Sequence, residues 1–345
     1  MTSRLAFLGD TLLGGEAQPI LDSRGHRYAL EEIAGLFDGV DLVVANLEGP
    51  LTHEVKPSAK ADTGRKRYWY RADPTSAAVL AGAGVGLVSL ANNHTLDFGM
   101  PGLRDTMSAL DAAGVAYCGA GLNEDQARRP AILSIAGCRI GFISCMQRYD
   151  MYVEERLYAS ARHGGCYQLR PRTIAEDLAA LKGLVDLRVV LVHWGRNYRG
   201  VAPRQERLAA VLRAAGADLI IGHHPHIAQR VDLSEGKPVV YSLGNGALGT
   251  PGRFHSGRPP YGLVTIVELD ASRRIAQLDL RLIAVDNSLV NYRPVLAYDK
   301  PAQAVLRSLV TSGNEWQVND GGLRAVLPAV VDGNAANAEP RVVAT

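Results

Sequence analysis

Six short apolar segments of the chain each run directly into a polar stretch that contains Gly, Asn, Asp, Glu or His. With the residues that follow them, they cover residues 4–10, 41–48, 85–94, 188–195, 218–226 and 239–245. Helical patterns separate most of these segments, an alternation typical of an α/β protein. Open α/β sheets bind ligands beyond the carboxyl ends of their strands. Turn formation alone would explain Gly, Asn and Asp there, but Glu48 and His193 are poor turn formers, so the pattern predicts a functional site.

Two further patterns predict antiparallel strands. Residues 131–144 read as a hairpin around Ala136-Gly137, and residues 261–285 as two strands around residues 270–274. A mixed sheet, or two layers of sheet, is therefore expected. For the 345 residues we predict one domain over 1–298 and a C-terminal extension over 299–345, mobile from about residue 333.

Composition excludes several classes of function. The formal charge of +2 gives no footprint for nucleic-acid binding. No apolar run approaches the ~18–20 residues that cross a bilayer, and the N-terminus lacks a signal-peptide core. We therefore expect a cytoplasmic protein without stable membrane insertion. The four cysteines have no metal-ligand spacing and are expected to be free thiols. The sequence does not indicate an oligomeric state.

The residues at the predicted strand ends suit metal binding. Five of the nine histidines lie in three short motifs at these ends. Carboxylates can bridge two cations, and imidazole suits transition metals. The candidate ligands are Asp10, Glu48, Asn93, His193, His224 and His226. On an extended segment, the His-x-His spacing of the last two would aim both rings to one side.

These motifs resemble the CapA-like branch, the bacterial poly-γ-glutamate capsule proteins, of the calcineurin-like metallophosphatase superfamily. The resemblance covers roughly residues 4–285 and rests on motifs in the family's order. They are Gly9-Asp10, Asn46-Leu47-Glu48-Gly49-Pro50-Leu51-Thr52, Ser89-Leu90-Ala91-Asn92-Asn93-His94, His193-Trp194-Gly195, Gly222-His223-His224-Pro225-His226 and Tyr241-Ser242-Leu243-Gly244-Asn245.

The resemblance implies a four-layered α/β/β/α sandwich with mixed sheets and one or two divalent metal ions (Mn, Zn, Fe or Ca) at the strand ends. It implies that Asp10 and His226 bind the first metal and that Glu48 bridges both. Asn93, His193 and His224 would bind the second metal. His94 resembles the superfamily's acid–base histidine, which contacts substrate.

The chain departs from the family pattern beside the site. The superfamily has Asp-x-His at the first motif, but Leu12 stands at the histidine position here, so the first metal has at most three protein ligands. The capsule branch usually reads His-Trp-Gly-x-Glu-Tyr, where this chain has Arg196 and Asn197 before Tyr198. Members that assemble capsule usually carry an N-terminal anchor, which is not seen in this sequence. A changed substrate or reaction is therefore expected.

Several residues are candidates for substrate binding. Residues 55–71 carry six basic residues against one acid, with interleaved aromatics, and form either a solvated loop or a cover over the site. Arg71 closes this segment and could hold a substrate carboxylate. Trp194 is either core or pocket wall. The other candidates are Arg196 and Asn197, which follow the His193-Trp194-Gly195 motif where the chain departs from the family, and Asn245, which ends the last motif.

Three classes of function remain open. The first is metal-dependent chemistry on a peptide-like substrate. Its preferred form is Cα epimerisation, with His94 as base, Asp10 or a second His as the acid on the opposite face, and a metal-stabilised enolate; amide-bond chemistry is the other form. The second is phosphoester hydrolysis by two metals. The third is a non-catalytic polymer- or peptide-binding protein of the poly-γ-glutamate type.

Overall fold

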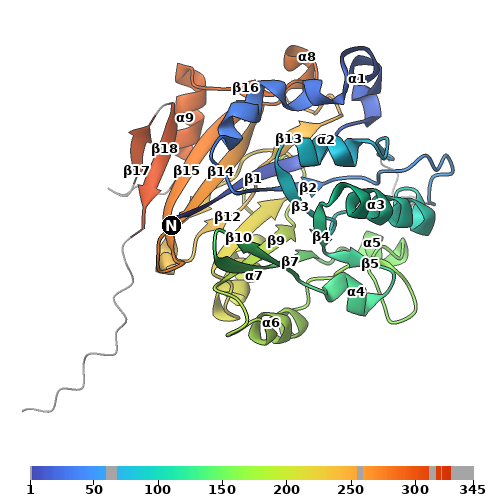
Figure 1. Ribbon diagram of the computed structural model, residues 1–345, viewed down its shortest axis with the longest axis horizontal. Helices are drawn as coiled ribbons and strands as arrows, with labels where there is room; N and C mark the ends of the chain where they lie inside the picture. The colour runs from blue at the N-terminus through green and yellow to red at the C-terminus, as the bar shows by residue number, and fades with distance from the viewer. Residues whose placement is uncertain (1, 60–67, 255–258, 311–315, 320, 328–345) are drawn as a thin grey trace, which may run out of the picture.

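The computed structural model describes residues 2–59, 68–254, 259–310, 316–319 and 321–327, arranged as two large sheets with helices on their outer faces (Figure 1). The first sheet runs in the order β17-β18-β15-β14-β1-β2-β3-β4, with β13 beside β1 and β16 beside β15. Its strands are β1 (Ser3–Leu12), β2 (Leu42–Leu47), β3 (Val85–Ser89), β4 (Ala116–Cys118), β13 (Asn245–Leu248), β14 (Tyr261–Leu269), β15 (Ile275–Ala284), β16 (Val295–Leu296), β17 (Trp316–Asn319) and β18 (Gly322–Val326).

The second sheet runs in the order β11-β12-β10-β9-β7-β6. Its strands are β6 (Ala131–Ile135), β7 (Cys138–Met146), β9 (Leu187–His193), β10 (Leu219–His223), β11 (Val231–Asp232) and β12 (Val239–Val240). A separate pair joins β5 (Ala120–Gly121) and β8 (Gly165–Cys166).

Helices lie outside the two sheets or in the connections between strands. They are α1 (Gln18–Arg24), α2 (Ser76–Gly82), α3 (Gly99–Ala113), α4 (Glu124–Arg128), α5 (Asp150–Glu154), α6 (Pro171–Ala180), α7 (Pro203–Ala214), α8 (Asn287–Val290) and α9 (Lys300–Ser308), with the 3-10 segments η1 (Gly15–Ala17), η2 (His26–Phe37) and η3 (Ser234–Gly236). Among the described helices, none is both long and apolar enough to cross a membrane.

Strand periodicity divides the core into layers. In β1, Leu5 and Phe7 belong to the apolar cluster between the sheets, whereas Leu8 belongs to the cluster under α2 and α3. In β7, Phe142 faces the space between the sheets and Ile143 packs with α6 and α7. Because successive side chains of a strand point to opposite faces, each inner sheet has one apolar face toward the other sheet and one toward helices. The predicted α/β/β/α sandwich with mixed sheets is confirmed.

Parallel pairing brings the polar strand ends together. In the first sheet β1, β2 and β3 are parallel neighbours, and Asp10 pairs in register with Asn46 and with Asn245. In the second sheet β7, β9 and β10 are parallel, and His193 pairs with His223. The edges of the two sheets at which these parallel strands end therefore meet at one site.

Both predicted antiparallel pairs are present, as β6 with β7 and β14 with β15. The expected boundary at residue 298 does not correspond to a break in the sheet. Strand β18 pairs with β15, and Leu306 of α9 and Leu323 of β18 are buried in the cluster between the sheets. A short amphipathic helix and two short strands complete the sheet edge because they cover apolar side chains of β15. The tail predicted to be mobile from about 333 lies outside the described residues.

The inter-sheet layer predicts the effect of a core substitution. Phe142→Ala removes a fully buried ring between the sheets and should lower the free energy of unfolding by about 3–5 kcal/mol. Ile132→Ala on the neighbouring edge strand β6, where the side chain is 40% exposed, is the matched control and should cost far less. Urea unfolding followed by circular dichroism measures both; equal losses would contradict the layered core.

Candidate metal centre

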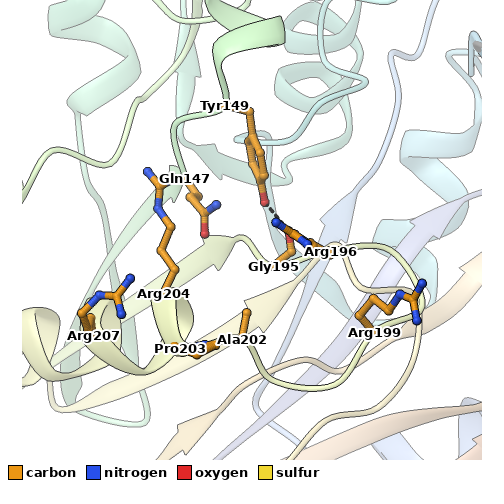
Figure 2. A pocket seen from close by; sticks show the side chains of 9 residues that line it. All are labelled: Gln147, Tyr149, Gly195, Arg196, Arg199, Ala202, Pro203, Arg204 and Arg207. Carbon is orange, nitrogen blue, oxygen red and sulfur yellow. Dashed lines mark hydrogen bonds between the residues drawn. The ribbon is translucent and has the colours of Figure 1, made fainter. Parts of the chain in front are cut away.

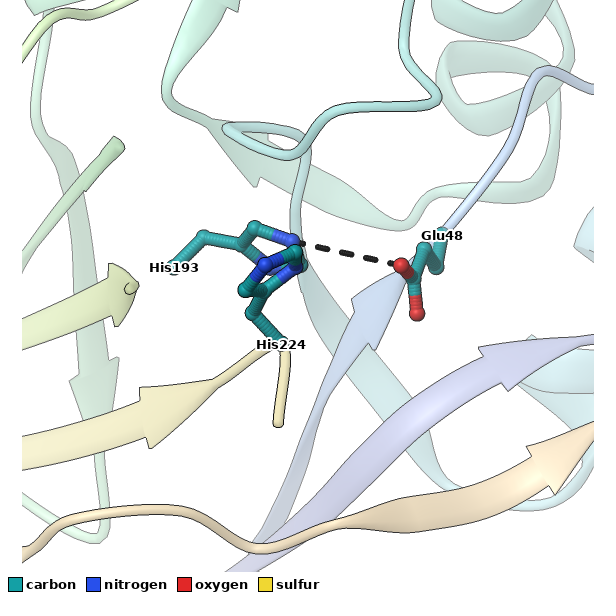
Figure 3. Close-up of side chains that lie close together, drawn as sticks. All are labelled: Glu48, His193 and His224. Atoms are coloured by element: carbon teal, nitrogen blue, oxygen red, sulfur yellow. Dashed lines mark ion pairs between the residues drawn. The ribbon is translucent and has the colours of Figure 1, made fainter. Parts of the chain in front are cut away.

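Two groups of potential metal ligands share one carboxylate, Glu48. One group joins Asp10, Glu48 and His226, and the other joins Glu48, His193 and His224 (Figure 3). Within each group the ligand atoms lie within 4.8 Å of one another, and all five side chains are buried. The arrangement matches the expected bridging role of Glu48, which follows β2 at the centre of the first sheet.

The first group is fixed by backbone and side-chain contacts of β1. The Asp10 N–H donates to the Gly244 carbonyl at 2.9 Å, and the Asn46 amide donates to Asp10 Oδ1 at 2.8 Å. Nδ1 of His226 lies 3.2 Å from Asp10 Oδ2 and 3.8 Å from Glu48 Oε2. One imidazole nitrogen therefore faces two carboxylates, which is the set expected for the first metal.

The second group gathers around the ends of β9 and β10. His193 Nε2 lies 3.9 Å from Glu48 Oε1 and 2.7 Å from the Asn93 side-chain oxygen. The rings of His193 and His224 are 4.6 Å apart. Asn93 therefore converges with the other three, as expected for a fourth ligand of the second metal.

The segment that carries His224 and His226 is not extended. Strand β10 ends at His223, and the next residues bend with φ of 98° at His224 and 60° at His226. These left-handed values are unfavourable for a side chain with a Cβ atom, and such strain clusters at functional sites. The expected strand geometry is wrong here, because the bend places the two rings in different ligand groups instead of on one side of a strand.

Burial shifts the ionisation of these groups. Burial and the neighbouring Asp10 raise the pKa of Glu48 well above its ordinary value. Burial lowers the pKa of His224 to about 3 and that of His223 to about 4, and lowers that of His193 strongly. For Asp10, burial raises the pKa, but contacts with His226, His223 and Asn46 outweigh it. His193, His223 and His224 are thus neutral imidazoles, the form that binds metals.

The residues present fit divalent cations. Both oxygens of Glu48 and Nδ1 of His224 are buried without a hydrogen bond to any described residue. Buried polar atoms nearly always have partners, and an uncompensated buried carboxylate is costly. Cations between the carboxylates and imidazoles would supply those partners. Leu12, at the position of the missing histidine, is buried in the apolar cluster and offers no ligand.

A histidine–aspartate pair lies beside the second group. His94 Nδ1 is 2.7 Å from Asp97 Oδ2, and both residues are buried. The same carboxylate oxygen accepts the Tyr70 N–H at 2.6 Å, and the Tyr70 ring stacks on His94 with centroids 4.0 Å apart. The contacts fix the orientation of the His94 ring. The part of residues 55–71 that the structure describes therefore reaches the site through Tyr70, while residues 60–67 lie outside the described residues.

Two strand-end amides support the ligands. Asn92 donates to the Leu47 carbonyl at 2.7 Å and lies 3.3 Å from the Asn46 oxygen, so it links the β3 end to the Asn46–Asp10 contact. Asn245, expected to contact substrate, lies with Oδ1 2.9 Å from His226 Nδ1. Its structural contact is thus with a candidate ligand.

The other predicted substrate residues do not share one place. Trp194 is fully buried and its indole N–H donates to the Tyr241 carbonyl at 2.8 Å, so it is core and not pocket wall. Arg196 is exposed and lines a pocket beside the metal centre, whereas Asn197 is exposed outside that lining. Arg71 is exposed, packs over Phe98 and lines a different pocket with Trp69.

The sequence reasoning missed Asp97, Gln147 and Tyr149. Asp97 lies three residues after His94, a spacing that one turn brings together. Gln147 and Tyr149 follow β7, so the strand-end rule applied elsewhere would have found them. The apolar segment before them was assigned only as half of a hairpin.

Comparison with known proteins shows the family. The sequence profile described as bacterial capsule synthesis protein PGA_cap matches residues 4–249. The chain belongs to this family.

Two curated relatives are named for capsule formation. The capsule biosynthesis protein CapA of Bacillus anthracis is 31% identical over 70% of this chain and 58% of its own length. The PGA biosynthesis protein CapA of Bacillus subtilis (strain 168) is 27% identical over 70% of this chain and 62% of its own length. The chain thus spans about three fifths of each relative.

Among solved structures, the calcineurin-like phosphoesterase YfkN of Bacillus subtilis aligns over 89% of this chain and 98% of its own, with 12% identity and a TM-score of 0.49. At that score we draw no conclusion from the alignment. The layered architecture above therefore rests on the sheets and clusters of this chain itself.

Replacing Glu48 should have opposite effects on thermal stability in the absence and in the presence of metal. At pH 7 in EDTA, Glu48→Gln should raise the melting temperature by at least about 2 °C, because it removes a buried carboxylate that has no hydrogen bond. With Mn²⁺ added, the variant should lose most of the thermal stabilisation that the wild type gains. The metal-free wild type should also lose stability as the pH rises above the ordinary Glu value of 4.5, since its folded pKa is raised.

The matched control is Glu31→Gln, an exposed glutamate of η2, which should behave as wild type in both conditions. Scanning calorimetry measures the melting temperature of all three proteins. A Glu48→Gln variant that melts lower than wild type in EDTA, or that keeps the full gain with Mn²⁺, would contradict the site.

Proposed function

We propose that this chain is a metal-dependent enzyme that cleaves or transfers an amide bond in a peptide-like, poly-γ-glutamate-related substrate. The observation that carries the proposal is the pair of ligand groups sharing Glu48, with His94 and Asp97 beside them. Membership of the capsule synthesis family, and the PGA biosynthesis role in the name of one relative, support a peptide-like substrate.

The chain supplies ligands for two cations. Asp10, Glu48 and His226 would hold one, and Glu48, His193, His224 and Asn93 the other. When bound, divalent cations held by these residues would supply activation of a water molecule and polarisation of the scissile carbonyl. The lowered pKa values of His193 and His224 keep these two ligands neutral and available at neutral pH.

We assign the proton transfer to His94. Its Nδ1 contacts Asp97, and in this proposal Nε2 donates the proton to the leaving amine. Asp97 acts through His94 as a positioning residue, because its carboxylate sets the ring's tautomer and orientation. Tyr70 covers one face of the ring and keeps water from it.

The geometry favours amide chemistry over Cα epimerisation, the form preferred from sequence. Epimerisation needs acid–base groups on opposite faces of one carbon, and the expected partner of His94 was Asp10 or a second histidine. The oxygens of Asp10 face Asn46, His223 and His226. These contacts support a role for Asp10 as metal ligand over a role as proton donor.

One incubation separates the candidate reactions. Metal-loaded protein is mixed with poly-γ-glutamate in D₂O, and in parallel with p-nitrophenyl phosphate. New amino termini without deuterium at Cα support amide cleavage, and amide transfer would appear as a shift in chain length by mass spectrometry. Deuterium at Cα without new termini would establish epimerisation instead. Phosphate release as the only reaction, or no reaction at all, would overturn the proposal.

Substitution of His94 separates a role in proton transfer from a role in metal binding. His94→Ala should lower kcat by about 10²–10⁴-fold while metal content stays at the wild-type level, because the ring moves a proton and is not in either ligand group. Asp97→Asn should lower kcat less than His94→Ala does and should shift the pH dependence of kcat. His163→Ala, on a half-buried histidine outside the site, is the control. Loss of bound metal in His94→Ala, measured by plasma mass spectrometry, would contradict the assignment.

A further inference from the structure

A pocket of about 620 Å³ opens next to the metal centre, and four of its lining residues are arginines (Figure 2). Arg196 and Arg199 lie in the loop after β9, and Arg204 and Arg207 lie on α7. Only the first was a substrate candidate from sequence. The other three come together because the loop turns back onto the start of the helix.

The pocket shares a wall with the second ligand group. The backbone N–H of Gln147, a lining residue, donates to the carbonyl of His193 at 2.9 Å. The Tyr149 ring lies 5.8 Å from the His224 ring, and its hydroxyl donates to the Gly195 carbonyl at 2.7 Å. A molecule in the pocket would therefore lie beside His193 and His224 of the second ligand group.

The pocket carries uncompensated positive charge. Among the described residues, none forms an ion pair or side-chain hydrogen bond with the four guanidinium groups, all of which are exposed. Glu206, which lies between the two helix arginines in sequence, pairs with Arg230 instead. The positive end of the α7 dipole adds to this charge. Guanidinium groups bind carboxylates and phosphates through paired N–H donors.

Gln147 distinguishes the kind of anion. Its side chain is 5% exposed and lines the pocket, and its Oε1 is buried without a hydrogen bond to a described residue. An unpartnered buried acceptor needs a donor, which an ionised carboxylate lacks and a peptide N–H supplies. The lining thus suits a ligand that has amide N–H groups and several anionic groups.

We propose that this arginine pocket is a binding subsite for the acidic side chains of a peptide-like substrate, with a ligand amide N–H donating to Gln147. The inference rests on the proposed function for the orientation of the substrate toward the cations. It concerns binding alone, so it can be tested without turnover.

The test uses metal-loaded protein that carries His94→Ala. Binding of a fluorescein-labelled hexaglutamate peptide is measured by fluorescence anisotropy. Arg204→Ala/Arg207→Ala should weaken binding at least tenfold and reduce its dependence on salt. The matched control removes two exposed arginines elsewhere, Arg24→Ala/Arg307→Ala, and should leave binding unchanged. Labelled hexaglutamine should not bind. Gln147→Leu should weaken hexaglutamate several-fold while leaving competition by inorganic triphosphate unchanged.

Equal loss in the two double variants, or no binding of hexaglutamate, would overturn the subsite. Triphosphate that binds more tightly than hexaglutamate and depends on Arg204 and Arg207 would assign the pocket to phosphate instead. Binding that behaves as expected in a protein that releases no new amino termini would leave the subsite standing and reject the proposed reaction. Substrate cleavage at the same rate in the Arg204→Ala/Arg207→Ala variant and in the wild type would reject the subsite and leave the proposed reaction standing.

Discussion

The buried carboxylate of Glu48 is the constraint on which the site depends. It lies between two imidazole-containing groups, is fully buried, and has no hydrogen bond to a described residue on either oxygen. Charge in that position is unfavourable unless cations compensate it. His193 and His224 cannot do so, since burial lowers their pKa values and keeps them neutral at physiological pH. Metal binding would resolve both problems and would tie the ends of the two sheets into one centre.

The fold explains how residues so far apart in sequence converge. Each sheet contributes parallel strands whose carboxyl ends open to the same side, with Asp10, Glu48 and Asn93 following strands of the first sheet and His193 and His224 following strands of the second. The apolar layer between the sheets holds these edges together. The same edge extends past β7 and β9 to the arginine pocket, so a substrate could contact both without a change of fold.

Periodic rules applied to the sequence predicted a mixed or two-layered sheet and six candidate ligands at strand ends, and the family resemblance added the four-layered sandwich. Strand alternation assigns each side chain to one face, and strand ends in parallel sheets collect polar residues at one edge. The sequence could not predict the left-handed backbone at His224 and His226. Nor could it place Trp194 in the core, because an aromatic residue beside a motif is equally compatible with the core and with a pocket wall. The pairing of β18 with β15, beyond residue 298, was also not predicted, since such short strands have weak sequence patterns.

Anomalous diffraction from crystals grown with Mn²⁺ tests the central claim most directly. Two peaks are expected. One should lie about 2.0–2.2 Å from oxygens of Asp10 and Glu48 and a nitrogen of His226, and the other at similar distances from Glu48, His193, His224 and Asn93. Both peaks should share Glu48 as a ligand. Density showing no metal at Glu48, with its carboxylate hydrogen-bonded to protein alone, would contradict the account.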